Sequence, residues 1–435
     1  MAHLDHGVTD AAKVAVIGGG WAGLAAAAEL AARGVAVTVL EAARTLGGRA
    51  RRVALEGVEL DNGQHVLIGA YRDTLAAMRR VGVDPALALE RVPLALEFVD
   101  GFRMRAPRAP HPLDLVLALL RARGAPLGGA LAAIAFLAKL RARRYRVVPD
   151  RAVARWLDDE GQRGPLRAHL WEPLCVSALN TPAALASAQV FASVLRDALA
   201  GARGASDLLL PRADLGRLFP EPAAALVRAS GGEIRLARAV RAIHGEPGRF
   251  RLDDEANVYS HVVVACAPQH VAALLPKWSG LEGVRATLAR FEYQPIVTCY
   301  LQYPESVALS APMIGFTGGL IQWVFDRGRL GGPRGLLAAV ISGSGPHADM
   351  DSRALVAAVE REIEAAWGRL PAPLWSRTIA ERRATFACTP GLERPATTTP
   401  VRGLLLAGDY VASDYPGTLE TAVRSGAAAA RAVAP

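Results

Sequence analysis

Three glycines near the N-terminus have the spacing of a nucleotide-binding turn. Gly18, Gly20 and Gly23 form the pattern G-x-G-x-x-G. In such a turn the first glycine permits a tight bend, the second lets the backbone approach a pyrophosphate, and the third lets a helix pack closely on a strand. Glu41 follows 18 residues after Gly23, where an acidic side chain can accept hydrogen bonds from a ribose. The pattern therefore predicts a dinucleotide site.

The surrounding residues predict the βαβ unit that such a turn needs. Residues 13–17 form an apolar run typical of a buried strand, residues 21–33 an Ala/Leu-rich helix, and residues 35–40 a second strand that ends at Glu41. The helix N-terminus would present free N–H groups and a positive dipole end to the phosphates. A lone glycine motif is weak, but the complete unit favours nucleotide binding.

Composition limits the class of protein. With 435 residues the chain is long enough for two domains, and it is 51% hydrophobic and 21% charged, as expected of a globular protein. It contains no uncharged apolar run of the roughly 18 residues that a membrane span needs. Residues 1–13 carry acids and histidines and no apolar signal core, so we expect a cytoplasmic protein.

Cysteines and net charge exclude two further classes. The four cysteines are scattered, which indicates neither a metal site nor a disulfide framework. The net charge of +9 comes from arginines spread along the whole chain, with only three lysines, so we expect no nucleic-acid partner. Neither composition nor motifs specify an oligomeric state.

Further strand and helix patterns extend to the C-terminus. A strand pattern over residues 403–409 ends in Gly408-Asp409, and the last helix begins at Leu419 and runs to about residue 434. The flavin end of an FAD must be held by something beyond the first βαβ unit, and Asp409 with the helix start at Leu419 suits that role; the alternative is an ordinary Gly-Asp turn. Between these ends we expect mostly helix over 72–205, strands over 233–236, 239–243, 261–267, 295–303, 319–325 and 336–342, and an amphipathic helix over 349–369.

The motifs resemble the superfamily of FAD-dependent amine oxidases and carotenoid desaturases, and the resemblance covers nearly the whole chain. Within it, the segments 61–71, 171–175 and 180–182 resemble the squalene-associated branch, the hydroxysqualene dehydroxylases of hopanoid biosynthesis. The superfamily resemblance rests on the glycine turn, Glu41, Leu46-Gly47-Gly48-Arg49, the segment 231–240, and Leu406-Ala-Gly408-Asp409 with the tail 416–426.

The resemblance implies an α/β fold of the amine oxidase type. A discontinuous Rossmann-like FAD-binding domain would comprise residues 1–75, 205–275 and 385–435. An α+β substrate domain would comprise residues 76–204 and 276–384.

The same resemblance implies roles for single residues. Gly48 and Arg49 would lie along the pyrophosphate and the flavin edge, where an arginine offsets negative charge. Val240 would give backbone hydrogen bonds to the adenine from a strand, and Asp409 would hold the ribityl or pyrophosphate region. Gly63, Gln64 and His65 would pass close to the reactive face of the flavin.

Two departures argue against amine oxidation. Amine oxidases of this superfamily commonly carry a lysine on the strand that matches residues 295–303, and Thr298 occupies that place here. Residues 412–416 offer no cysteine for covalent flavin attachment. The resemblance then implies a non-covalent FAD facing an apolar pocket that suits an isoprenoid.

For a dehydroxylase, the departing hydroxide needs a proton donor. A carboxylic acid in an apolar pocket has a raised pKa and stays protonated near neutrality. Glu172, in a mostly apolar segment, is our candidate for this acid, and a surface or salt-bridged Glu is the alternative. His65 is the competing candidate donor.

Two apolar segments within residues 111–146 suit a C30 hydrocarbon substrate. Residues 111–120 and 127–140 are apolar, and a run of basic residues follows them. We expect a monotopic contact with the inner face of the cytoplasmic membrane, in which apolar side chains enter the interface and arginines meet anionic headgroups. Alternatively, these helices only roof the substrate pocket.

Two other functions stay open from the sequence. A carotenoid-type desaturase would use the same scaffold to remove hydride from a polyene. A lipid-escort protein resembling Rab GDP-dissociation inhibitors would bind an isoprenoid without redox chemistry. The intact glycine turn with Arg49 and Asp409 argues against the escort protein.

Overall fold

The computed structural model describes residues 12–199, 201 and 203–433. Two expectations lie outside these ranges: the character of residues 1–11 and the end of the last helix at residue 434. Among the described residues, no helix has the length and apolar character needed to cross a bilayer.

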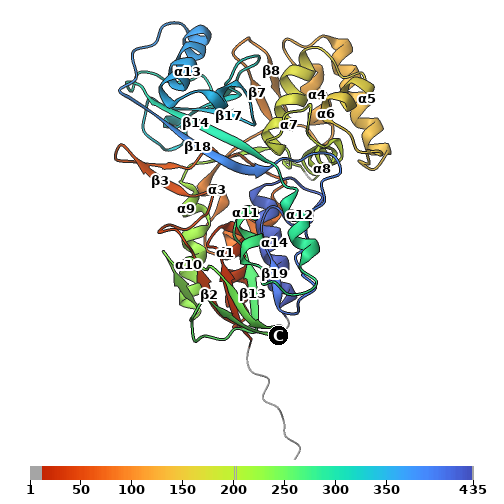
Figure 1. The fold of residues 1–435 in the computed structure, drawn as a ribbon. Coiled ribbons are helices and arrows are strands. Elements are labelled where there is room, and N and C mark those ends of the chain that lie inside the picture. The colour runs from red at the N-terminus through yellow and green to blue at the C-terminus, as the bar shows by residue number, and fades with distance from the viewer. Residues whose placement is uncertain (1–11, 200, 202, 434–435) are drawn as a thin grey trace, which may run out of the picture.

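A five-stranded parallel sheet forms the lower body of the molecule (Figure 1) and confirms the Rossmann-like fold. Four of its strands are mostly buried apolar runs, as expected where helices cover both faces of a parallel sheet, and the edge strand at residues 233–235 is charged and partly exposed. They come from three separate stretches of the chain, each within a segment that we assign to FAD binding. The strand order is β10 (Glu233–Arg235), β2 (Ala36–Leu40), β1 (Lys13–Ile17), β13 (His261–Val264) and β19 (Leu404–Leu406).

Helix α1 (Trp21–Ala32) lies against this sheet and contacts α14 (Leu419–Ala432) and α10 (Pro220–Ala229). Its sequence is rich in alanine, and small side chains let the helices approach closely. A Cβ added to Gly426 of α14 would lie 2.1 Å from the carbonyl oxygen of Ala22. The first helix and the last are therefore in contact through a glycine.

A second, antiparallel five-stranded sheet lies above the parallel one, and β14 and β18 cross the middle of the molecule in Figure 1. Helix α13 (Ser352–Trp367) packs against the face that Val297 and Leu301 share, so Thr298 and Tyr300 point to the opposite face. The strand order is β15 (Met313–Gly315), β16 (Trp323–Asp326), β17 (Leu336–Ser342), β14 (Tyr293–Gln302) and β18 (Trp375–Phe386).

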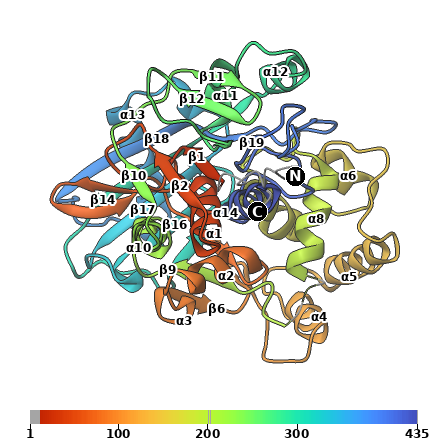
Figure 2. The same ribbon diagram turned by 90° about the horizontal axis from the view of Figure 1, so that it is seen from below.

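A helical body stands beside the second sheet, and the view from below separates the two (Figure 2). Helices predominate over residues 72–205, as expected, and three short strands lie among them: β6 (Leu89–Val92), β7 (Ala95–Glu97) and β8 (Arg103–Arg105). Strand β6 pairs with β9 (Leu208–Pro211), more than a hundred residues away, so nothing local signals it. The helices are α4 (Leu113–Leu120), α5 (Leu127–Ala142), α6 (Val153–Asp159), α7 (Glu172–Leu179) and α8 (Ala188–Leu199).

The remaining elements connect these bodies. They are β3 (Arg52–Leu55), β4 (Val58–Asp61), β5 (Leu67–Ile68), α2 (Arg72–Arg80), α3 (Pro85–Ala88), a π-helical turn (Arg167–Trp171), α9 (Leu215–Leu218), β11 (Ile243–Glu246), β12 (Arg249–Leu252), α11 (Pro268–Leu274), α12 (Glu282–Ala289) and two short 3₁₀ turns (Gly328–Leu330 and Pro346–Asp349).

A buried carboxylate joins α2 to α14. Glu420, in the first turn of α14, is fully buried, and burial raises its pKa. Its Oε1 accepts the N–H of Asp73 at 3.1 Å, and its Oε2 accepts the N–H and hydroxyl of Thr74 at 2.9 and 2.7 Å. An α-helix leaves its first N–H groups without intrahelical partners. Glu420 thus caps α2, although it lies more than 340 positions away from that helix in sequence.

Candidate flavin site

The three motif glycines have different surroundings. Gly18 has a φ of +114°, and a Cβ there would lie 2.6 Å from the carbonyl oxygen of Ala265; a Cβ on Gly23 would lie 2.0 Å from that of Gly18. These two glycines are required by contacts within the protein. At Gly20 the nearest atom to an added Cβ is the Cα of Gly48, at 3.8 Å. Open space therefore lies beside Gly20, where the motif predicts a pyrophosphate.

Glu41 lies at the carboxyl edge of the sheet, directly beside this turn. Its Oε2 accepts the N–H of Gly19 at 2.6 Å, and its Oε1 accepts the N–H of Ala43 at 2.7 Å. These bonds hold the carboxylate at the end of β2, the place expected for a ribose partner.

Val240 lies in a loop, and the strand expected over 239–243 is wrong, because β11 begins only at Ile243. The Asp253 carboxylate accepts the N–H groups of Arg241 and Ala242 at 2.8 and 2.9 Å. A side chain therefore takes the bonds that a strand ladder would use. The same loop donates the N–H of Arg238 to the carbonyl of Glu41 at 2.9 Å, so it lies beside the expected ribose position.

An ion pair joins the two ends of the chain at the site. Arg49 Nη2 lies 2.6 Å from Asp409 Oδ1, and Arg49 Nη1 donates to the carbonyl of Ala384 at 2.6 Å. Gly48 precedes Arg49 and faces the glycine turn: a Cβ on Gly48 would lie 3.3 Å from the Cα of Gly20. The loop carrying Gly48 and Arg49 and the strand end carrying Asp409 thus form one wall.

The start of α14 meets this wall. The helix begins at Leu419, and a Cβ on Gly417 would lie 3.2 Å from Asp409 Oδ2, so the helix start lies beside that carboxylate. Next to Asp409, the hydroxyl of Tyr410 is buried and has no hydrogen-bond partner among the described residues. An unpaired buried hydroxyl and the open space at Gly20 both fit a bound dinucleotide whose polar groups complete the site.

Gln64 and its loop are tied to the second sheet. Gln64 Nε2 donates to the hydroxyl of Tyr300 at 2.8 Å, and its Oε1 accepts from Arg327 at 3.2 Å. The hydroxyl of Tyr300 donates to the carbonyl of Asp61 at 2.9 Å. These bonds use one donor and one acceptor of the side-chain amide and fix its orientation toward the second sheet.

His65 lies in the site, beside Arg49. Burial lowers the pKa of His65; a hydrogen bond to the carbonyl of Gly63, at 3.1 Å from Nδ1, raises it in part, and the positive charge of Arg49 lowers it further. The imidazole is therefore mostly neutral at pH 7.

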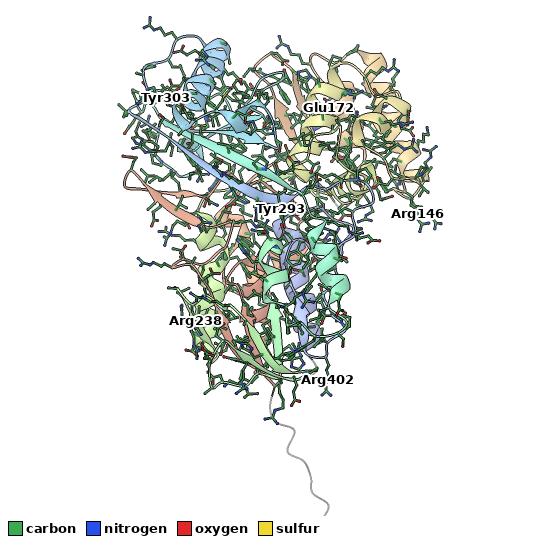
Figure 3. All side chains as sticks on the ribbon, in the orientation of Figure 1. Arg146, Glu172, Arg238, Tyr293, Tyr303 and Arg402 are labelled. Carbon is green, nitrogen blue, oxygen red and sulfur yellow. The ribbon has the colours of Figure 1, made fainter. Side chains whose placement is uncertain are left out.

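Glu172 has surroundings different from those expected. Its Oε1 lies 2.7 Å from Arg167 Nε, and its side chain is 39% exposed. Figure 3 places it in the helical body, whereas Tyr293 lies where the bodies meet. The expected apolar environment is absent, because the carboxylate is partly exposed and paired with a guanidinium.

Sequence reasoning did not single out Asp61, which is buried within this network. Burial raises the pKa of Asp61 to about 6, although the N–H of Leu215, bonded at 2.8 Å, and the charge of Arg327 lower it. The signal available in the sequence was its position at the end of a strand, before Asn62 and Gly63.

The raised pKa of Asp61 predicts a pH-dependent stability. The pKa of an aspartate in the unfolded chain is about 3.9, so the folded carboxyl holds its proton more tightly. The stability that this proton contributes to the folded protein is complete below pH 4 and is lost as pH rises through about 6. Asp61→Asn keeps an oxygen for the N–H of Leu215 and does not titrate. We expect it to be more stable than the natural protein by about 2–3 kcal/mol at pH 7.5 and equal at pH 4, in urea unfolding. A constant difference across pH would contradict this.

Comparison with known proteins agrees with this geometry. Residues 21–434 match the family of flavin-containing amine oxidoreductases, and the chain belongs to that family. It is a flavin-dependent oxidoreductase, and its cofactor is FAD. The chain is 31% identical to the hydroxysqualene dehydroxylase of Rhodopseudomonas palustris, over 96% of this chain and 97% of that protein.

More distant matches show the breadth of the fold. The zeta-carotene desaturase of Zea mays is 22% identical, over 95% of this chain and 82% of that protein. Among solved structures, cyclohexylamine oxidase from Brevibacterium oxydans has a TM-score of 0.69 at 19% identity, covering 97% of this chain and 98% of that one. The structural match confirms the fold of the amine oxidase type.

Proposed function

We propose that this protein catalyses the FAD-dependent reductive dehydroxylation of hydroxysqualene to squalene. The observation that carries the proposal is the 31% identity, over nearly the full length of both chains, to a hydroxysqualene dehydroxylase. The carotenoid desaturases match at lower identity, 22% for the maize protein, which makes desaturation the second candidate. A non-redox escort role does not fit a flavin oxidoreductase.

The surroundings of Thr298 support an apolar substrate. Its register partners on the two neighbouring strands are Val340 and Ile379, and its own hydroxyl is buried without a partner among the described residues. A Cβ on Gly63 would lie 3.7 Å from that hydroxyl, so this part of the sheet faces the loop that leads to His65. No charge stands where amine oxidases commonly carry a lysine, as an isoprenoid requires.

The reaction balances as an exchange of hydroxyl for hydride. Reduced FAD supplies the hydride and a proton; the C–O bond breaks, a C–H bond forms, and the hydroxyl leaves as water. The hydroxyl is allylic, so the carbon bears a resonance-stabilised positive charge as the bond breaks. The protein must exclude water and deliver a proton to the departing oxygen.

Anaerobic incubation tests the function directly. Photoreduced protein mixed with hydroxysqualene should give squalene and oxidised flavin in equal amounts. Oxidised protein mixed with a carotenoid precursor is the parallel assay. Polyene formation there, without squalene formation from hydroxysqualene, would establish the desaturase instead.

For the proton donor we propose His65, which lies in the site, in preference to Glu172. Since the pKa of His65 is lowered, its acidic form is lost above that pKa, and turnover should fall as pH rises from 5 to 8. His65→Ala should lose roughly 10²–10⁴-fold in turnover while keeping its flavin spectrum. Glu172→Gln should stay within about threefold of the natural protein, because its carboxylate is paired with Arg167.

Two variants make the pH profile specific. Asp61→Asn removes a nearby carboxyl group whose pKa is about 6 and should leave the shape of the profile unchanged. A large loss in Glu172→Gln with normal His65→Ala turnover would reverse the assignment.

The division of labour between the bodies is also part of the proposal. Residues 1–75, 205–275 and 385–435 hold the cofactor, and residues 76–204 and 276–384 hold the substrate. Support comes from the parallel sheet, whose strands all fall in the first set.

We further propose that α4 and α5 contact the inner face of the cytoplasmic membrane. Leucines on both helices are exposed: Leu113 (56%) and Leu120 (39%) on α4, and Leu127 (63%) and Leu131 (54%) on α5. Residues 127 and 131 are one helical turn apart, so they share a face. Exposed apolar patches of this kind mark interaction surfaces, and the substrate is a membrane-soluble hydrocarbon.

Replacing these leucines should release the protein from membranes. In Leu127→Ser/Leu131→Ser we expect vesicle binding about 100-fold weaker, since burying each leucine contributes roughly 1.5–3 kcal/mol. The flavin spectrum should not change. Co-sedimentation with vesicles measures the binding, and equal binding by the variant would mean that the helices only cover the pocket.

A further inference from the structure

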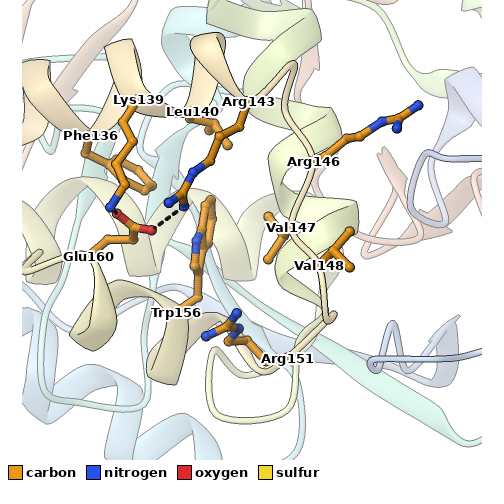
Figure 4. Close-up of a pocket in the computed structure, with 10 residues that line it drawn as sticks. All are labelled: Phe136, Lys139, Leu140, Arg143, Arg146, Val147, Val148, Arg151, Trp156 and Glu160. Carbon is orange, nitrogen blue, oxygen red and sulfur yellow. Dashed lines mark hydrogen bonds and ion pairs between the residues drawn. The ribbon is translucent and has the colours of Figure 1, made fainter.

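A cavity of about 500 Å³ lies in the helical body, between α5, α6 and the segment 143–151 (Figure 4). Its volume is within the range of small-molecule sites. It does not share any lining residue with the flavin site described above. Its walls are formed by Phe136, Lys139, Leu140, Arg143, Arg146, Val147, Val148, Arg151, Trp156 and Glu160.

The charged part of this lining has an excess of cations. The lining includes four basic residues and one acid, Glu160. Lys139 Nζ lies 2.5 Å from Glu160 Oε2 and Arg143 Nη1 lies 2.9 Å from Glu160 Oε1, and Figure 4 shows both side chains converging on this carboxylate. Each contact uses only part of the donor capacity of the cation. Glu160 therefore fixes two cations in the wall and leaves them able to bind an anion.

The other two cations stand further along the wall. Arg151 pairs with Asp159 at 2.7 Å. Arg146 also lines the cavity, and its guanidinium points away from Glu160 in Figure 4. Arginine recognises phosphate oxygens well because its planar donors can bind two of them at once.

The rest of the lining is apolar. Phe136, Leu140, Val147 and Trp156 are buried walls, and Val148, between Arg146 and Arg151, is 82% exposed. The exposed valine gives the rim of the cavity an apolar contact beside positive charge, a combination that suits the interface of a bilayer. The cavity thus combines positive charge with apolar surface, as an amphiphilic anion requires.

We propose that this cavity binds the phosphate headgroup of an anionic phospholipid. Lys139 and Arg143 contact the phosphate, Arg146 adds positive charge at the edge of the cavity, and Val148 meets the acyl region. This inference rests on the proposed membrane contact, because α5 carries two of the exposed leucines and Lys139, and Arg143 follows directly after its last residue. The headgroup site would give the membrane contact a preference for anionic phospholipids.

Vesicles of two compositions test the preference. Binding to phosphatidylcholine vesicles is compared with binding to vesicles that contain 30% phosphatidylglycerol, chosen as about a physiological share of anionic lipid. Phosphatidylglycerol should increase the vesicle affinity of the natural protein. In Arg143→Gln/Arg146→Gln we expect this increase in affinity to be roughly 10- to 30-fold smaller. The matched control, Arg249→Gln/Arg402→Gln, makes the same charge change away from the cavity and should stay within about twofold; Arg402 lies at the lower end of Figure 3.

A soluble lipid separates the cavity from general surface charge. Dihexanoyl phosphatidylglycerol, below its micelle concentration, should perturb the fluorescence of Trp156 in the natural protein, and Trp156→Phe should remove that change. The Arg143→Gln/Arg146→Gln variant should show no change at the same concentrations. Turnover of detergent-solubilised substrate should be equal in all these variants.

Each result decides the proposal. No preference of the natural protein for phosphatidylglycerol, or an undiminished preference in Arg143→Gln/Arg146→Gln, overturns it and leaves the leucine contact intact. An equal response to inorganic phosphate overturns the lipid assignment in favour of a free anion. If the natural protein binds neither kind of vesicle, the membrane proposal fails, and the response to the soluble lipid alone decides for or against the headgroup site.

Discussion

Gly20→Val should give a folded protein that contains no flavin. The backbone at Gly20 has φ −78° and ψ −179°, which valine adopts readily, and the nearest atom to its Cβ would be 3.8 Å away. The new side chain would instead fill the space of the pyrophosphate. Losing two hydrogen bonds to charged oxygens costs about 1.5–3 kcal/mol each, so FAD should bind about 10²–10⁴-fold more weakly. Absorbance and circular dichroism after purification measure cofactor and fold.

Two other glycines make the result specific. Gly283 of α12 also has open space around it, so Gly283→Val should remain yellow. Gly23→Val should fail to fold, because its Cβ would lie 2.0 Å from a carbonyl oxygen. A fully flavin-loaded Gly20→Val protein would show that the phosphate does not lie at this turn.

Glu420→Ala should destabilise the protein by about 3–5 kcal/mol. The change leaves three donors on Asp73 and Thr74 without their acceptor, and it leaves Arg424, 3.0 Å away, without its closest buried carboxylate. Because α14 begins beside Asp409, flavin content should fall as well. Urea unfolding, followed by both circular dichroism and flavin fluorescence, measures the two effects.

The neighbouring acid Asp73 supplies the control. Its side chain is 55% exposed and pairs with the same Arg424 at 2.9 Å. Asp73→Ala keeps the backbone N–H that Glu420 accepts, so it should cost less than about 1 kcal/mol. Similar losses of stability in both variants would mean that the ion pairs of Arg424, and not the cap on α2, carry the stabilisation.

The cofactor half of the molecule could be predicted well from sequence because its signals are local. Strand β1 and helix α1 follow the predicted bounds within a residue, since an apolar run and a glycine turn specify them directly. The family resemblance placed Arg49 and Asp409 at the same cofactor, but the ion pair between them was not predicted, because nothing local relates residues 360 positions apart.

Other parts were missed for identifiable reasons. Strand β18 lies at the edge of its sheet and carries Arg377, Glu381, Arg382 and Arg383, so its residues do not alternate cleanly. Glu172 follows the buried Trp171 in the sequence, yet it turns outward to Arg167. The neighbours of a helical residue in sequence face other directions, so the composition of a segment does not give the burial of one side chain.

The parallel sheet determines when the cofactor can bind during synthesis. Strand β1 gains β2 as a neighbour within about thirty residues, but β13 joins it only after some 250 residues and β19 only at Leu404. A growing chain emerges from the ribosome N-terminus first, so the glycine turn exists for most of translation without the strand that brings Asp409 to Arg49. Closing so long a loop is slow relative to local folding. Flavin capture is therefore a late event, and a chain that stops before residue 409 would carry the motif without holding the cofactor.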